Sequence, residues 1–206
     1  MTTETDTSSK TLINRRRLLV SGLISGLVFA FMPKQTFAAK KRGEVYLLRG
    51  FGDIFSTGID EMGAELRQAG VDASVKSHVA WRMVANTIIA DRQKYGVQPV
   101  ILIGHSLGAN AIISIAEVLE KKGIQVDYMA TFAATAPDPL PGNIRRVVNF
   151  YFSSHGWGLP LVPGPRFKGK LNNRDFAGMK DIGHFNIEKQ RPLQAEVVRD
   201  VLKSLR

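Results

Sequence analysis

The sequence contains no cysteine. Disulfide bonds and cysteine-based zinc or redox sites are therefore excluded, and an exported form of the chain would hold together without disulfides. The sequence also lacks a hydrophobic run of the roughly 20 residues that a transmembrane helix needs. The longest candidate, residues 18–32, covers about 15 positions and is interrupted by serine and glycine. This length favours an export signal over a membrane span.

Acidic residues are scarce relative to basic ones: 18 Asp and Glu stand against 28 Lys and Arg, for a formal net charge of +10. A nucleic-acid-binding protein would group such an excess on one face, interleaved with aromatic side chains. Here the basic residues lie in short scattered groups such as 121–122 and 145–146. We therefore expect no nucleic-acid partner. We interpret the charge as a solvated surface with a weak attraction to anionic lipid or cell-wall polymers.

Residues 1–38 have the order of a secretory leader. A basic group at Arg15-Arg16-Arg17 precedes the short apolar run, and Thr36-Phe37-Ala38 offers small residues for cleavage before Ala39. The paired arginines resemble a twin-arginine export signal. We predict an exported protein, periplasmic or secreted, with residues 39–206 as its single domain. The alternative is that residues 1–38 are retained as an inner-membrane anchor.

Residues 100–108, Val-Ile-Leu-Ile-Gly-His-Ser-Leu-Gly, are the most informative segment. An apolar β-branched run leads into a G-x-S-x-G pattern, and a helical pattern follows at once. This is the context of a nucleophile elbow, in which a strand delivers a serine onto a sharp turn before a helix. The turn leaves no space for side chains two residues to either side of the serine, so glycine is needed there. The segment predicts Ser106 as a nucleophile. Without that chemistry, it would be a glycine-rich turn with an idle serine.

Strand and helix patterns alternate along residues 44–206. Period-two or continuous apolar runs predict strands, and apolar residues at helical spacing predict helices between them. The expected strands cover 44–48, 71–75, 126–132 and 146–152, in addition to the run before Ser106. Strands separated by helical crossovers indicate a parallel sheet covered on both faces.

From Glu44 to Arg206 the chain resembles the α/β-hydrolase superfamily, in its small serine lipase, esterase and thioesterase branch. The resemblance implies an α/β fold, a three-layer sandwich with a mostly parallel sheet. It also implies a minimal version of the fold without its first strands or a large lid. No cofactor motif is present, and we expect neither a cofactor nor a metal.

Members of this superfamily present serine, an acid and histidine in that chain order. Ser106 matches the nucleophile, and His184, just ahead of the final helical pattern, matches the base. His155 is the other histidine in the right stretch. For the acid, the usual loop after the 146–152 strand offers no carboxylate. Asp138, after the preceding strand, is the first choice for the acid. Two later residues, Asp175 and Asp181, remain alternatives.

The resemblance also implies an oxyanion hole formed by two backbone N–H groups, those of Leu107 and Phe51. The alternative is that the glycines around Phe51 form a plain tight turn. Residue Arg49 could anchor an anionic substrate group, although a structural salt bridge fits it better. His105, inside the elbow, is expected to pack and point away from the chemistry. Residues 155–167, rich in glycine, proline and apolar side chains, either fold back onto the core or form an apolar wall beside Ser106.

Three function classes fit these residues. A serine hydrolase would cleave carboxylic ester or thioester bonds of a small-molecule or lipid substrate. An acyltransferase or serine peptidase could use the same residues, and a non-catalytic binding protein could keep the scaffold without turnover. The combination of Ser106 and His184 favours an enzyme over the binding protein.

Overall fold

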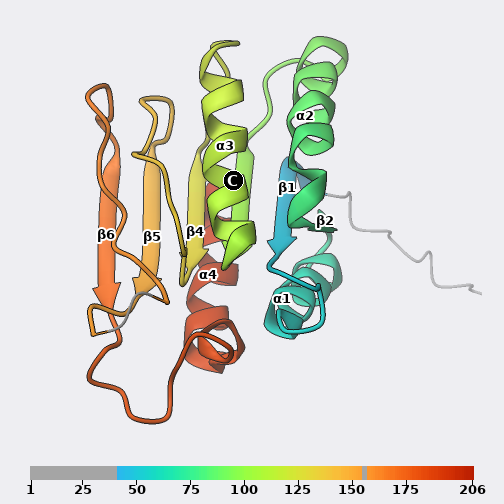
Figure 1. The fold of residues 1–206 in the computed structure, drawn as a ribbon. Helices are drawn as coiled ribbons and strands as arrows, with labels where there is room; N and C mark the ends of the chain where they lie inside the picture. Colours follow the sequence, from blue (N-terminus) through green and yellow to red (C-terminus); the bar gives the residue numbers. More distant parts are fainter. Residues whose placement is uncertain (1–40, 155–156) are drawn as a thin grey trace, which may run out of the picture. The chain divides into compact units, whose positions relative to one another are not determined.

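A computed structural model describes residues 41–154 and 157–206, which form a six-stranded sheet with helices on both faces (Figure 1). The strands are β1 (Lys41–Arg49), β2 (Val71–Ser77), β3 (Val100–His105), β4 (Tyr128–Phe132), β5 (Arg146–Tyr151) and β6 (Lys170–Asp175). The helices are α1 (Thr57–Gln68), α2 (Trp81–Tyr95), α3 (Leu107–Glu120) and α4 (Arg191–Ser204), with 3₁₀ turns η1 (His78–Ala80) and η2 (Ile187–Lys189).

The strands are arranged in the order β2-β1-β3-β4-β5-β6, and every neighbouring pair is parallel. A parallel sheet needs covered faces, and this explains the continuous apolar run of β3, whose six residues are all buried. The expected three-layer α/β-hydrolase-like arrangement is thereby confirmed, with a sheet that is parallel throughout.

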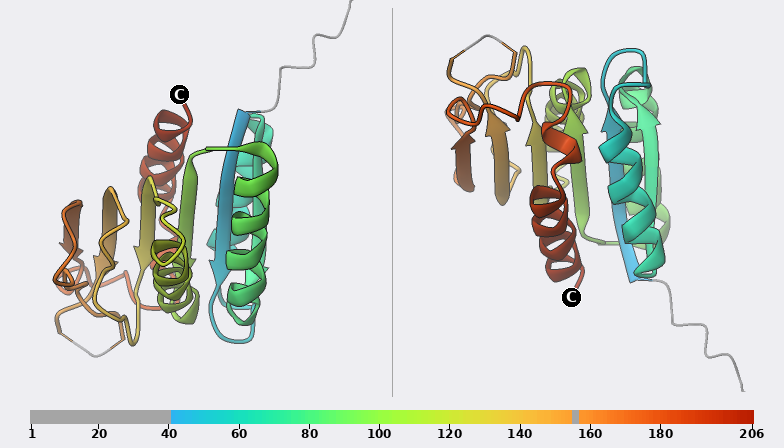
Figure 2. Two further views of the ribbon diagram at one scale, coloured as in Figure 1. Left: turned by 90° about the horizontal axis from the view of Figure 1, so that it is seen from above. Right: turned by 90° about the horizontal axis from the view of Figure 1, so that it is seen from below.

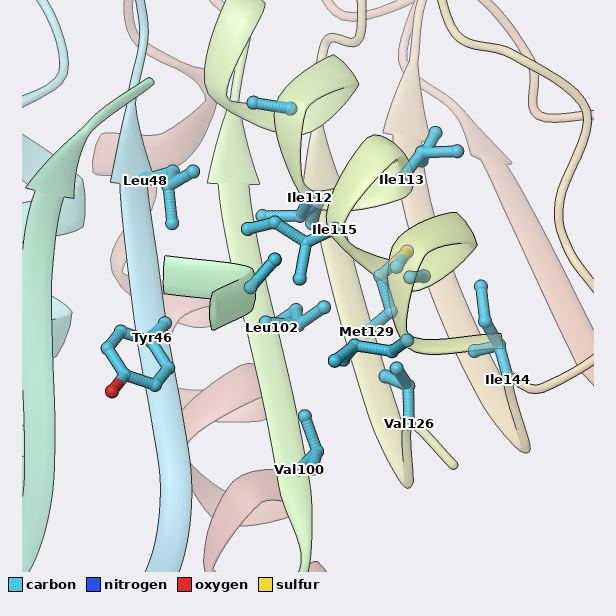
Figure 3. Close-up of a cluster of buried hydrophobic side chains, with 14 of the residues drawn as sticks. Tyr46, Leu48, Val100, Leu102, Ile112, Ile113, Ile115, Val126, Met129 and Ile144 are labelled. Carbon is cyan, nitrogen blue, oxygen red and sulfur yellow. The ribbon is translucent and has the colours of Figure 1, made fainter. Parts of the chain in front are cut away.

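Successive residues of the central strands point to opposite faces of the sheet, because side chains alternate along a strand. Tyr46, Leu48 and Leu102 pack with α2 and α3 on one face (Figure 3). Val45 and Leu47 pack with α1 and α4 on the other. Figure 2 shows the two helix pairs on opposite sides of the sheet. Each face thus has its own buried apolar cluster.

The sheet reverses its winding direction between β1 and β3. From β1 the chain moves outward through α1 to β2, and then returns through α2 to β3 on the other side of β1. In open α/β sheets, ligands bind at the carboxyl ends of the strands where this reversal occurs. Here those ends carry the loop after Arg49 and the turn at Ser106, because Leu48 pairs with Gly104.

The sequence patterns did not predict strand β6. Its residues, Lys-Leu-Asn-Asn-Arg-Asp, are exposed or only partly buried and include no apolar run, since β6 lies at the edge of the sheet beside β5. Strand β4 is also shorter than expected, because Val126 contributes only an isolated bridge to Ile144. Polar edge strands have little hydrophobic periodicity from which to be recognised.

The predicted leader, residues 1–38, lies outside the described residues, so the export signal stays a prediction. Within residues 41–154 and 157–206, no helix has the length and apolar character that crossing a membrane requires.

We predict that Leu102→Ala destabilises the protein by about 2–5 kcal/mol, because the fully buried side chain leaves a cavity between β3 and the helices on that face. Urea unfolding monitored by circular dichroism measures the change. Val97→Ala is the control, since Val97 is 86% exposed. Equal effects of the two substitutions would contradict this description of the core.

Candidate active site

Ser106 occupies the sharp turn between β3 and α3. Its φ of 56° and ψ of −122° lie in a region that residues with a side chain rarely adopt. The N–H of Ser106 donates to the carbonyl of Phe132 at 2.9 Å, which ties the turn to the end of β4. Local strain of this kind persists only where surrounding structure holds it, and it gathers at functional sites.

The two glycines of the motif allow the backbones around this turn to approach closely. A Cβ on Gly104 would collide with the backbone of Gly108. A Cβ on Gly108 would collide in turn with the carbonyl oxygens of Leu48 and Arg49 at the end of β1. Any side chain at either position would therefore push α3 away from the sheet.

The structure brings Ser106 and His184 together across 78 positions of the sequence: His184 Nε2 lies 3.0 Å from Ser106 Oγ. On the other side of the ring, His184 Nδ1 lies 3.1 Å from the carbonyl oxygen of Trp157. A carbonyl can only accept, so Nδ1 carries the hydrogen and Nε2 is the unprotonated nitrogen, which accepts from the serine hydroxyl. This is the tautomer that a general base needs.

Two aromatic side chains pack against the His184 ring. Trp157 meets it edge-on with centroids 5.2 Å apart, and Phe185 does so at 4.9 Å. The loop before η2 is fixed by Asn186, whose side-chain oxygen accepts from Gly183 N–H at 2.7 Å. His184 is only 7% exposed, so its base nitrogen works in a largely water-excluded setting.

The three candidate acids are all exposed. Asp138 is exposed, and its charge acts on Glu117 of α3, whose pKa is raised first by burial and then by Asp138. Asp175 accepts from the N–H groups of Ser153 and Ala177, and contacts from these two residues hold its pKa below the usual value. Asp181 is exposed. Asp138 therefore stays a prediction for the acid, and the contact found at Nδ1 is the one with the Trp157 carbonyl.

The other histidine considered as a base, His155, lies outside the described residues.

The loop after β1 lies directly against the nucleophile. A Cβ on Gly50 would come within 2.9 Å of the Ser106 Cβ, so only glycine fits this approach. Phe51 directly follows Gly50, so its backbone N–H lies close to the serine. Leu107 is the first residue of α3, and its N–H has no partner within the helix. These are the two donors expected to form the oxyanion hole.

Arg49, just before this loop, forms a bidentate ion pair with Asp60 of α1, with Nε 3.0 Å from Oδ2. This supports the structural interpretation of Arg49, because its guanidinium is already occupied.

A cavity of about 470 Å³ opens beside Ser106 and is mainly apolar. Its walls include Phe51, Phe55, Trp157 and Phe185. The rings of Phe55 and Phe185 are 5.6 Å apart, and those of Trp157 and Phe185 are 6.0 Å apart. These side chains are about half exposed or more, so the rim is apolar where it meets solvent.

Both alternatives for the glycine- and proline-rich loop are found in its described part. Trp157 forms a wall of the cavity, whereas Leu161 is buried in the core. Two asparagines from the sheet hold this loop. Asn149 donates to the carbonyl of Leu159 at 3.1 Å, and Asn173 bonds both the N–H and the carbonyl of Leu161.

Sequence reasoning missed Ser56 and underrated His105. His105 bonds Ser56 Oγ through Nδ1 and the His184 carbonyl through Nε2, and it also lines the cavity that contains Ser106. Burial lowers the pKa of His105 to about 4. The buried Glu188 lies 3.7 Å from the same Nε2, and burial raises its pKa to about 7. No sequence signal marks these contacts, since they join residues up to 79 positions apart.

No family model and no curated protein matches the chain. Solved structures with a similar arrangement include a proposed hydrolase of the α/β superfamily from Xanthomonas campestris pv. campestris, at 16% identity and a TM-score of 0.47. This match covers 79% of this chain and 99% of that one. They also include the type II thioesterase BorB of the borrelidin cluster, at 14% identity and a TM-score of 0.48, covering 79% and 92%. The RedJ thioesterase of Streptomyces coelicolor matches at 11% identity and a TM-score of 0.49, covering 94% and 100%. Matches at this level identify neither a substrate nor a reaction for this chain.

We expect Gly108→Ala to destabilise the protein by about 1–3 kcal/mol and to disturb the turn, because the new methyl group meets backbone that cannot rotate away. Gly178→Ala is the matched control, since a Cβ there has open space. Thermal unfolding of both variants measures the difference. An unfolding temperature for Gly108→Ala equal to that of the control would refute the close packing of α3 on β1.

Proposed function

We propose that this protein is a serine hydrolase that cleaves carboxylic ester or thioester bonds through an acyl-enzyme on Ser106. The observation that carries the proposal is the 3.0 Å contact between Ser106 Oγ and His184 Nε2, with His184 in the base tautomer beside an apolar cavity. A nucleophile and base at hydrogen-bond distance, with a third group orienting the base, form the usual signature of covalent acyl transfer.

In the acylation step His184 Nε2 takes the Ser106 proton as Oγ attacks the substrate carbonyl carbon. The carbonyl oxygen becomes negative and is met by the N–H groups of Phe51 and Leu107, at the positive end of α3. The tetrahedral species collapses, the bond to the alcohol or thiol breaks, and His184 returns the proton to that leaving group. Water, activated by the same nitrogen, then attacks the acyl-enzyme and releases the acid and Ser106.

In this proposal the Trp157 carbonyl takes the orienting role that a carboxylate has in a triad. It fixes Nδ1–H and places partial negative charge next to the imidazolium that forms. A neutral carbonyl stabilises that cation less than a carboxylate does. The burial of the ring partly compensates, because the electrostatic interaction with the carbonyl dipole is stronger in the low dielectric of the protein interior.

The aromatic walls favour an apolar acyl group as the part of the substrate that binds. A methylene group moved from water to such a wall contributes about 0.8 kcal/mol, which is about fourfold in kcat/KM. A cavity of about 470 Å³ has room for an acyl chain of several carbons. Acetyl esters should therefore be poorer substrates than butyryl or hexanoyl esters.

The central test is Ser106→Ala on residues 39–206, assayed with p-nitrophenyl and N-acetylcysteamine esters of increasing acyl length. We expect turnover to vanish, together with labelling by a fluorophosphonate, because the nucleophile is gone. Ser204→Ala in α4 is the control and should keep full activity. Turnover of Ser106→Ala within about tenfold of wild type would refute the proposal. A release of free acid in water, rather than ester formation with added alcohols, separates a hydrolase from an acyltransferase.

We further predict that His184→Ala lowers kcat by about 10³-fold or more, whereas Asp138→Asn changes it by less than about threefold. The reason is that Asp138 is exposed and its charge acts on Glu117, while the Trp157 carbonyl accepts from Nδ1 of His184. Stopped-flow measurement of kcat settles both values, and Asp175→Asn is a matched control carboxylate. A loss near 10⁴-fold in Asp138→Asn would show instead that this residue reaches the ring during turnover.

A further inference from the structure

Three hydrogen bonds run in series along the wall of the cavity that contains Ser106 and His184. Gly50 N–H donates to Ser56 Oγ at 2.9 Å, Ser56 Oγ lies 2.8 Å from His105 Nδ1, and His105 Nε2 lies 2.8 Å from the His184 carbonyl oxygen. The series joins the loop after β1, the end of β3 and the loop before η2. These segments supply Phe51 N–H, Ser106 and the His184 ring.

The direction of each bond is fixed by the two ends of the series. The Gly50 amide can only donate, and the His184 carbonyl can only accept. Nε2 of His105 therefore carries the hydrogen, which makes Nδ1 an acceptor in the neutral ring. Ser56 then accepts from Gly50 and donates to His105. Every polar group in the series is satisfied in one arrangement only, so the hydrogen bonds select a single geometry.

The position of Ser56 supports a role beyond local structure. It precedes α1, where a serine side chain would commonly accept from the first helical N–H groups. Here Ser56 makes no such capping bond, and its fully buried hydroxyl joins Gly50 to His105 instead.

An ion pair with Glu188 is the alternative role for His105. Such a pair needs a protonated ring, whereas burial lowers the pKa of His105 to about 4. Burial also raises the pKa of Glu188 to about 7, which keeps much of this carboxyl neutral near pH 7. Its Oε2 is 3.7 Å from Nε2, well beyond the 2.8 Å of the carbonyl. The geometry therefore favours the hydrogen bond to the His184 backbone.

We propose that His105 is a positioning residue, which holds the Phe51 loop and the His184 loop in register with the Ser106 turn. This inference rests on the proposed function, because it assigns a role in that same reaction. His105 is the last residue of β3 and directly precedes Ser106. Its side chain therefore links both loops to the strand that carries the nucleophile. The His184 ring and the Phe51 N–H must each be held to a fraction of an ångström, since a misplacement of about 1 Å can cost about 10²-fold in rate.

The test separates the two halves of the series with His105 variants of the full chain. The amide nitrogen of Gln can replace Nε2–H, and the amide oxygen of Asn can replace Nδ1. We expect His105→Leu to lower kcat by about 10²-fold with KM nearly unchanged. His105→Gln should recover most of kcat, because it restores the donor to the His184 carbonyl. The kcat values of His105→Asn and Ser56→Ala should lie between those of His105→Leu and His105→Gln.

Asn143→Leu is the matched control. It removes an amide that donates to the Ala116 and Ile124 carbonyls near the carboxyl end of α3, away from Ser106. The proposal holds if His105→Leu loses kcat at a temperature where both variants are equally folded by circular dichroism and the control keeps its rate. It is overturned if His105→Leu keeps kcat within about threefold of wild type, or if the control loses as much.

Nuclear magnetic resonance of the imidazole nitrogens gives a readout independent of turnover. We expect His105 as the Nε2–H tautomer down to about pH 5, and a single ordered His184 ring that becomes mobile in His105→Leu but not in Asn143→Leu. If wild-type turnover proves independent of Ser106, the proposed function fails, and these spectra still decide the positioning role. An Nδ1–H tautomer of His105, or an unchanged His184 ring in His105→Leu, would overturn it.

Discussion

The close approach of three backbones at Ser106 is the constraint on which the rest of this site depends. Gly108 lets α3 lie on the carbonyl groups at the end of β1, and Gly104 lets the turn fold back on α3. Gly50 admits the loop after β1 to the Ser106 side chain. Because none of these three positions tolerates a Cβ, the serine, the helix terminus and the candidate oxyanion loop are fixed relative to one another before any side-chain contact is made.

Within the described part of the chain, the side chains of Ser56, His105 and His184 form more hydrogen bonds with main-chain atoms than with other side chains. The His184 ring is oriented by a carbonyl of residue 157, and the His184 main chain is held in turn by His105. Main-chain partners are rigid and always present, so these contacts define the geometry of the site. Glu188, the buried carboxyl nearest to this series, fits the same pattern, since its raised pKa favours the neutral form.

The fold and part of the site could be predicted from the sequence because their signals are local. The apolar run of β3, the glycine spacing around Ser106 and the helical pattern of α3 lie within 21 consecutive positions, residues 100–120. Chain order singled out Ser106 and His184, and both belong to the site, although their catalytic roles stay predictions. The Trp157 carbonyl and the link from Ser56 to His105 could not be foreseen. A carbonyl has no residue-specific signature, and a bond between distant positions depends on the finished fold.

Strand β6 shows how one sequence property can have two effects. Its lysine, asparagines and arginine hid it from sequence prediction. They also stand on the last strand of the sheet, for which β5 is the one pairing partner among the residues that the structure describes. An apolar strand at that position would offer unpaired N–H and carbonyl groups to another chain, and such edges promote aggregation. Charged and amide side chains make this pairing unfavourable. The same asparagines, through Asn173, hold the loop that carries Trp157. Protection of the sheet against self-association and support of the active-site wall therefore come from one short polar strand.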